Sequence, residues 1–148
     1  MISPELLRRY PYFGGISEES LKAVAMIADE KCVSGGTELF RAGDAADWLN
    51  VIVRGEVNIQ YELGSGEKRT VDTLVDGDIL GWSALVEPHK YTAVCTASKE
   101  TQLVVIHGRK LRELCEQEAL LGYRLMTQIA KLLAHRLEGA RVQLAAAD

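Results

Sequence analysis

The sequence has few of the residues on which disulfide frameworks depend. Its 148 residues include only three cysteines, Cys32, Cys95 and Cys115. Their number is odd, their spacing is wide and no two form a C-x-x-C pair, which excludes a regular disulfide framework. Cys95 falls in an apolar, strand-like run and Cys115 in an amphipathic helical pattern. We expect both to be buried thiols that act as small hydrophobic side chains.

Histidine is equally scarce, and the three present, His89, His107 and His135, are isolated from one another. None lies at metal-ligand spacing from another His, a Cys or a carboxylate. The sequence also has no nucleophile elbow, P-loop or dinucleotide-binding fingerprint. The sequence therefore predicts no metal centre and no catalytic residues, and the chain is expected not to be an enzyme.

Long apolar runs and a basic charge balance are missing too. No run approaches the roughly 18 apolar residues needed to cross a bilayer, and the first residues lack the basic and apolar regions of a secretory signal. The chain has 21 Asp and Glu against 17 Lys and Arg, a net charge of -4. Nucleic-acid binding relies on Lys and Arg that meet phosphates, and no helix-turn-helix follows the last helical pattern. We expect a cytoplasmic protein that contacts neither membrane nor nucleic acid directly.

Residues 1–148 are predicted to form a single domain. Three consecutive zones differ in the secondary structure that their residue patterns predict. Residues 1–29 are predicted to form short helices, one of which begins at Ser17. The Ser17 hydroxyl can cap free backbone N–H groups, and Ile16 can pack on Leu21. Residues 108–148 are predicted to be helical again.

The middle zone, residues 30–107, has the pattern of short antiparallel strands. In residues 56–63, Val57, Ile59, Tyr61 and Leu63 alternate with polar residues, the period of a half-buried strand. A glycine turn at 64–66 leads into a second strand over 67–75. Further strands are expected over 48–53, 91–97 and 102–107. The fold predicted is mainly β, an antiparallel β-roll or jelly roll (a double-stranded β-helix) with short N-terminal helices and a long C-terminal helix.

The long C-terminal helix, predicted from residue 120 to about 144, has an apolar arc of about 160° on a helical wheel. An arc of roughly 100° is enough to cover one core. The extra width favours a helix covered twice, by its own roll and by a second copy in a homodimer, over a helix sunk in a monomer. Leu125, Ile129, Leu132 and Leu133 are expected to contribute both to the dimer contact and to packing on the roll. Arg136 lies inside the apolar arc and is expected to face a pocket or a partner helix.

Glycines at strand ends carry the most specific pattern in the sequence. The order from Gly36 through Gly43-Asp44 and Gly55 to Ile59 resembles the cyclic-nucleotide-binding domain family. That family includes catabolite activators, regulatory subunits of cyclic-AMP-dependent kinase and cyclic-nucleotide-gated channels. The segment 74–85, with Gly77-Asp78 and Gly81, followed by Thr92-Ala93, is similar to the family's phosphate-binding cassette. The resemblance covers nearly the whole chain.

The resemblance implies a ligand site at the cassette. Gly81 would allow a tight turn into a short helical turn near 82–85, whose unpaired N–H groups suit an anion. The ligand expected is a cyclic nucleotide or another small phosphate-containing molecule. The residues predicted to bind it are Gly81, Trp82, Ser83, Ala84, Lys90, Tyr91, Thr92, Ala93 and Arg136.

Two positions of the cassette depart from the family pattern. Trp82 replaces a glutamate that bonds the ribose in the family, and Tyr91 replaces an arginine that pairs with the cyclic phosphate. Lys90 lies beside Tyr91, but a lysine offers a point charge instead of a planar bidentate fork. The fold is therefore expected to follow the family more closely than the ligand, and cyclic AMP is predicted to bind weakly.

Two functions remain open from the sequence. The first is a small-molecule-sensing regulatory domain in signal transduction, in which ligand binding in the roll moves the C-terminal helix and signals to a protein partner. The alternative is a degenerate roll that binds no nucleotide and serves as a dimerisation or protein-interaction module.

Overall fold

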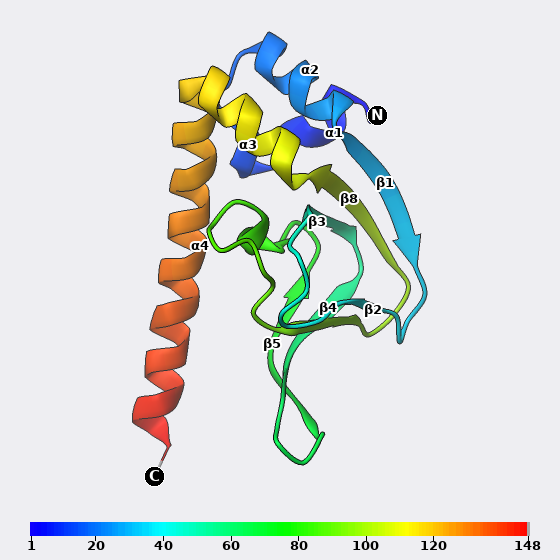
Figure 1. Ribbon diagram of the computed structural model, residues 1–148, viewed down its shortest axis with the longest axis vertical. Coiled ribbons are helices and arrows are strands. Elements are labelled where there is room, and N and C mark those ends of the chain that lie inside the picture. The colour runs from blue at the N-terminus through cyan, green and yellow to red at the C-terminus, as the bar shows by residue number, and fades with distance from the viewer. Residues whose placement is uncertain (148) are drawn as a thin grey trace.

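The N-terminal residues form three short helices that cover one end of the molecule (Figure 1). The computed structural model describes residues 1–147. The helices are α1 (Pro4–Arg8), η1 (Pro11–Phe13) and α2 (Glu18–Met26). The Ser17 hydroxyl accepts a hydrogen bond of 3.1 Å from the Ser20 N–H at the start of α2, so the cap predicted from the sequence is confirmed.

The middle of the chain forms eight antiparallel strands in two sheets, which confirms the predicted β-roll. One sheet has the order β1-β8-β3-β6 and the other the order β2-β7-β4-β5. The strands are β1 (Ala28–Val33), β2 (Glu38–Phe40), β3 (Trp48–Arg54), β4 (Glu56–Glu62), β5 (Lys68–Val75), β6 (Ile79–Leu80), β7 (Val94–Ala97) and β8 (Thr101–His107).

The strand predicted over 91–97 begins later than expected, at Val94. Tyr91 instead exchanges backbone hydrogen bonds with the loop before β3. Its N–H donates to the Asp44 carbonyl at 2.9 Å, and its carbonyl accepts from the Gly43 N–H at 2.8 Å. Lys90 makes an isolated bridge with Ala45 in the same loop. These contacts between distant segments hold residues 90–93 outside the sheet.

Two apolar clusters stabilise the fold, one on each face of the β1-β8-β3-β6 sheet. The outer face carries Leu49, Val51, Val104 and Ile106 against the helices. The inner face carries Ile52 and Leu103 against residues of the second sheet. The period-2 alternation along β3 and β8 sends neighbouring side chains to opposite faces, so both clusters are built from the same strands.

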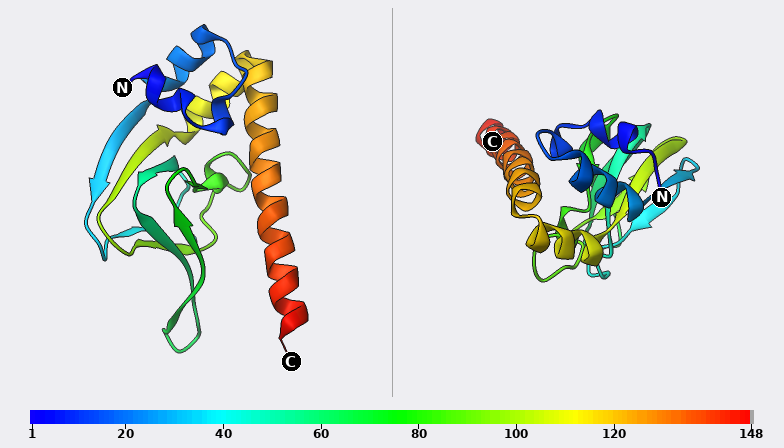
Figure 2. Two further views of the ribbon diagram at one scale, coloured as in Figure 1. Left: turned by 180° about the vertical axis from the view of Figure 1, so that it is seen from behind. Right: turned by 90° about the horizontal axis from the view of Figure 1, so that it is seen from above.

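Two helices follow the roll: α3 (Gly108–Gln117) and α4 (Ala119–Ala146). The long helix α4 runs along one side of the roll and extends past α3 (Figures 1 and 2). Leu121, Leu125 and Ile129 are fully buried in the chain's own core, and Leu132 and Leu133 pack against it. Leu125 and Ile129 therefore pack on the chain's own core and have no exposed surface for a dimer contact. Within residues 1–147, no helix is long and apolar enough to span a membrane.

Candidate functional site

The cassette is a tight turn between β6 and a short helical segment. Gly81 follows β6 in the left-handed conformation, with φ of 79°, and the 3-10 helix η2 (Trp82–Ala84) begins directly after it. A Cβ atom at position 81 would lie 2.8 Å from the Trp48 carbonyl oxygen. Only glycine fits this backbone without strain, as the turn predicted from the sequence requires.

The structure distributes the predicted ligand residues between the interior and the surface. Lys90 and Thr92 are exposed, and Trp82 is half-buried. The buried residues of the set are Gly81, Ser83, Ala84, Tyr91 and Ala93. Lys90 is therefore the exposed neighbour of a buried aromatic side chain.

Tyr91 is held inside the roll by stacking and by hydrogen bonds. Its ring stacks on Phe40, with centroids 3.7 Å apart and an angle of 12° between the ring planes. Its hydroxyl donates to the Trp48 carbonyl at 2.8 Å and accepts from the Trp48 N–H at 3.2 Å. Burial raises the pKa of the Tyr91 hydroxyl. The position at which the family resemblance expects a cation thus carries an uncharged ring packed against the Gly81 turn.

Arg136 reaches from α4 to the roll next to the cassette. Its Nη2 donates to the Ile79 carbonyl at 3.2 Å, two residues before Gly81. Its Nε lies 3.9 Å from an Asp72 carboxylate oxygen on β5. The side chain is 19% exposed. The sequence predicted that Arg136 faces a pocket or a partner helix, and the structure places it against the chain's own roll.

The same guanidinium influences a buried thiol on the inner face of the roll. Burial raises the pKa of Cys95 to about 12, and the positive charge of Arg136 acts in the opposite direction. Cys95 pairs with Ile59 in the sheet, and Ile59 pairs with Asp72 on the other side. Arg136, Asp72 and Cys95 therefore belong to one region between α4 and the inner face of the second sheet.

A second arginine, which sequence reasoning missed, holds the other end of the cassette. Arg112 on α3 donates from Nη1 to the Ala84 carbonyl at 2.6 Å. Gly108, at the start of α3, lies close to the same turn, because a Cβ there would be 3.1 Å from the Ala84 Cβ. Arg112 sits in an ordinary amphipathic helical pattern, so no sequence signal distinguishes it from a surface arginine.

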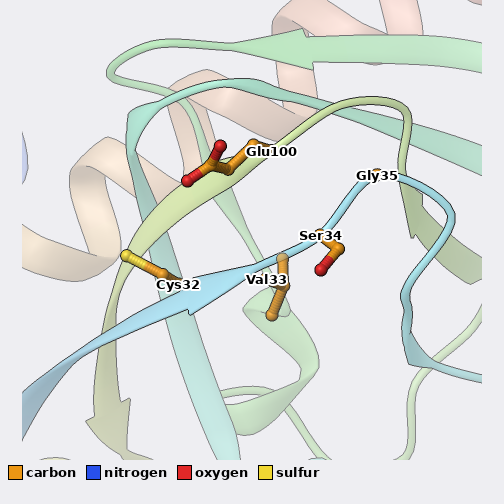
Figure 3. A pocket seen from close by; sticks show the side chains of 5 residues that line it. All are labelled: Cys32, Val33, Ser34, Gly35 and Glu100. Carbon is orange, nitrogen blue, oxygen red and sulfur yellow. The ribbon is translucent and has the colours of Figure 1, made fainter.

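A separate hollow lies at the far turns of the roll (Figure 3). It has a volume of about 340 Å³ and is lined by Cys32, Val33, Ser34, Gly35 and Glu100. Its residues come from the end of β1 and the turn after it, and from the turn before β8. None of the predicted ligand residues lines it. Residues 1–147 contain no group of three or more His, Cys, Asp or Glu side chains that could hold a metal ion.

Comparisons with known sequences identify the family of the domain. The sequence profile of the cyclic nucleotide-binding domain matches residues 30–118. The chain is 25% identical over 134 residues to the cyclic AMP receptor protein of Thermus thermophilus, covering 90% of this chain and 60% of the receptor. It is 33% identical over 93 residues to cGMP-dependent protein kinase isozyme 1 of Drosophila melanogaster, covering 62% of this chain and 12% of the kinase. The chain thus spans only part of these relatives.

Solved structures show the same fold. A crystal structure from Geobacter metallireducens GS-15, described as a candidate cyclic nucleotide-binding protein, has a TM-score of 0.83 and 37% identity, covering 93% of this chain and 99% of that one. The regulatory domain of Toxoplasma gondii PKA, crystallised with cAMP, has a TM-score of 0.67 and 26% identity, covering 75% of this chain and 42% of that one. The profile match and the β-roll together establish that the chain belongs to the cyclic nucleotide-binding domain family.

Proposed function

We propose that residues 1–148 form a single small-molecule-sensing regulatory domain, not an enzyme, in which a ligand binds at the cassette and changes the position of α4. The family is one of regulatory domains that bind cyclic nucleotides. We also propose that the domain acts in the cytoplasm. The weakly acidic charge of the chain disfavours direct contact with nucleic acid.

The observation that carries this proposal is the pair of arginine tethers on the cassette. Arg136 of α4 bonds the carbonyl of Ile79 before the turn, and Arg112 of α3 bonds the carbonyl of Ala84 after it. A movement of residues 79–84 relative to α4 or α3 would stretch the bond to that helix. Both helices are therefore mechanically linked to the one turn that the family resemblance assigns to the ligand.

Arg136 also supplies a cation near a cassette that has lost its own. Its guanidinium donates a hydrogen bond to the neutral Ile79 carbonyl, and its Nε lies 3.9 Å from a carboxylate oxygen of Asp72. A small anionic ligand at the cassette would offer it a charged acceptor, and hydrogen bonds between charged partners are stronger than those to a carbonyl. We infer that the ligand is a small anion bound by Arg136 together with Gly81, Trp82, Ser83, Ala84, Lys90, Tyr91, Thr92 and Ala93.

Cyclic AMP is expected to be a poor ligand of this site. The loss of a buried arginine–phosphate pair costs about 2–5 kcal/mol, judged from truncations of buried charge pairs. At 1.4 kcal/mol for each tenfold change, a micromolar site becomes one of roughly 30 μM to millimolar affinity. Tyr91 and Trp82 offer aromatic surface instead, which favours an anion with a different shape.

Calorimetry with cyclic AMP and cyclic GMP, preceded by a thermal-shift screen of small phosphates, tests the proposal. A ligand at 100 times its Kd adds about 2.7 kcal/mol of stability. The double variant Trp82→Glu, Tyr91→Arg is expected to gain cyclic-nucleotide binding. The variant Arg136→Ala is expected to bind any ligand found more weakly than the wild type. The variant Arg141→Ala, at an exposed position of α4, is expected to bind it with unchanged affinity. Micromolar binding of cyclic AMP by the wild type would contradict the expected affinity, and an Arg136→Ala variant with unchanged ligand response would contradict the coupling.

The alternative function, a dimerisation module without a ligand, is favoured by one feature of α4. Beside the stripe packed on the roll, the helix carries a second apolar stripe at alternating spacings of four and three residues. That spacing is typical of coiled-coil contacts. The stripe consists of Met126, Ala130, Leu133, Leu137, Ala140 and Leu144. Five of these six residues are exposed and Leu133 is half-buried. We propose that this stripe forms a homodimer contact in either function, leaving the other surfaces for a protein partner.

A further inference from the structure

A second cavity lies inside the roll, on the side away from α4. It has a volume of about 200 Å³ and lies between the β1-β8-β3 face of one sheet and β2 of the other. Lys31, Phe40, Trp48, Asn50, Tyr91 and Leu103 line it. Strand β1 and helix α4 lie on opposite sides of the roll (Figures 1 and 2). The cavity is therefore distinct from the region around Arg136, although Tyr91 borders both it and the cassette turn.

The walls of this cavity suit one flat ring. Phe40 and Tyr91 present stacked rings, and Trp48, which also lines the cavity, is 40% exposed. Aromatic side chains favour stacked or edge-on contacts with another ring. The volume is slightly larger than the roughly 150 Å³ cavity that holds benzene and smaller than the roughly 300 Å³ lower limit of drug-sized sites. A nucleotide is too large for it.

One buried amide gives the cavity a polar end. Asn50 is 6% exposed, and its Nδ2 makes one long hydrogen bond, 3.4 Å, to the Trp48 carbonyl. Every fully buried side-chain nitrogen or oxygen of residues 1–147 has a partner. No donor in those residues bonds the Oδ1 of Asn50, so this oxygen is not fully buried, and Asn50 lines the cavity. It can accept a hydrogen bond from a ligand.

The other end of the cavity carries a positive charge. Lys31 is exposed on β1, and no carboxylate of residues 1–147 forms an ion pair with it. Strand β8 separates β1 from β3. Lys31 lies level with Ile52 across Leu103, two residues along β3 from Asn50, so the Lys31 and Asn50 backbones are about 12 Å apart. Lys31 and Asn50 pair with Leu103 and Val105, which also line the cavity, so both side chains face the same side of the sheet.

We propose that this cavity binds a single-ring aromatic carboxylate that carries a hydroxyl opposite the carboxylate. The ring lies against Phe40, Tyr91 and Trp48, the carboxylate pairs with Lys31, and the hydroxyl donates to the Oδ1 of Asn50. The probe that represents this class is 4-hydroxybenzoate. Because Tyr91 packs both on this cavity and on Gly81, the bound ring rests on a side chain that supports the cassette.

Calorimetry and fluorescence of the whole chain test the proposal. The chain has two tryptophans, so in the variant Trp82→Phe the emission reports Trp48 alone. Saturable titration by 4-hydroxybenzoate with a Kd of about 0.1–1 mM is expected for a ligand of this size. We expect 4-hydroxybenzoate to bind most tightly, benzoate less tightly because it lacks the hydroxyl, and 4-hydroxybenzyl alcohol least tightly because it lacks the carboxylate. Each step is expected to raise the Kd at least threefold.

Lys31→Glu is expected to weaken 4-hydroxybenzoate at least tenfold, whereas the same charge change at Lys22, exposed on α2, leaves the affinity unchanged. Asn50→Leu is expected to remove the preference for 4-hydroxybenzoate over benzoate. Arg136→Ala is expected to bind the probe normally, which also separates this site from the proposed ligand site at the cassette. The proposal is overturned if the wild type shows no saturable binding up to 10 mM, if Lys31→Glu binds equally well, or if Arg136→Ala abolishes binding.

Discussion

The Arg136 guanidinium on α4 donates a hydrogen bond of 3.2 Å to the Ile79 carbonyl on β6, across 57 residues of sequence. This bond is a polar link between the exposed half of the long helix and the strand that leads into the cassette. Apolar contacts hold α4 from Leu121 to Leu133, and Arg136 extends that attachment by about one further turn of helix.

Removal of the Arg136 side chain is expected to loosen the C-terminal half of α4. A hydrogen bond from a charged donor contributes about 1.5–3 kcal/mol when well buried, and the partial exposure of this one reduces its contribution to about 1 kcal/mol. Arg136→Ala should lower the free energy of unfolding in urea by that amount. Hydrogen exchange should become faster in residues 133–146 and stay the same in β3. Unchanged exchange in α4 would show that the bond does not hold the helix.

The exposed stripe on α4 is expected to hold two copies of the chain together. Leu137 is 52% exposed, so Leu137→Asp places a charge in the proposed contact without disturbing the chain's own core. It should weaken the dimer by at least about 2 kcal/mol, more than tenfold in Kd. His135→Asp, on the opposite side of the helix, is the matched control and should leave the dimer intact. Light scattering at micromolar concentration measures both, and a monomeric wild type would refute the contact.

Gly81 is expected to tolerate substitution worse than another glycine of the same backbone conformation. Gly81→Ala combines a left-handed backbone, about 1–2 kcal/mol for an L-residue, with a Cβ 2.8 Å from a carbonyl oxygen. The total loss should be roughly 3 kcal/mol. Gly66 has φ of 87° but open space around its Cβ, so Gly66→Ala should cost about 1 kcal/mol. Urea unfolding compares the free energies of unfolding of the two variants directly. Equal losses of stability would show that the backbone at position 81 shifts to accommodate the added methyl group.

Stability is expected to fall above pH 10, and Tyr91 contributes to that fall. Burial raises the pKa of its hydroxyl above the ordinary value of 10.0, so the folded protein holds this proton more tightly than the unfolded chain. The stabilisation is full below pH 10 and is lost as pH rises from 10 through the folded-state pKa. Tyr91→Phe should lose about 1–2 kcal/mol at neutral pH, because the Trp48 backbone loses its partners. Its stability should also depend less steeply on pH above 10, and an identical alkaline slope would contradict this role.

The thiols of Cys32 and Cys95 are expected to differ sharply in reactivity. Cys32 is exposed and Cys95 is buried, with a pKa of about 12. The thiolate is the reactive form, so a thiol reagent at pH 8 should label Cys32 within minutes and Cys95 only on unfolding. Mass spectrometry of digested, labelled protein identifies the sites. Fast labelling of Cys95 in the folded state would show that the inner face of the roll opens readily.

The sequence was sufficient for the features that depend on neighbouring residues. The Ser17 cap, the strand over residues 56–62 and the turn at Gly81 all follow from local backbone chemistry, and the structure shows each of them. The burial alternation expected in that strand holds only at Val57, because Ile59 is half-buried like its polar neighbours and Tyr61 is exposed. The apolar arc of α4 likewise predicted that Leu125 and Ile129 pack on the roll, although it also assigned them to a dimer contact for which they have no exposed surface. Hydrophobic periodicity and helix capping depend only on residues that are close together in the sequence, so they can be recognised without the tertiary structure.

Only the tertiary structure decided what the residues of the candidate site contact. The sequence did not predict that Tyr91 stacks on Phe40, that Arg112 bonds the Ala84 carbonyl, or that the Asn50 amide opens onto a cavity. Each of these contacts joins segments that are at least 28 residues apart or depends on how two sheets enclose a space. Their partners are backbone carbonyls, apolar rings and empty volume, which leave no pattern of residue types along the chain.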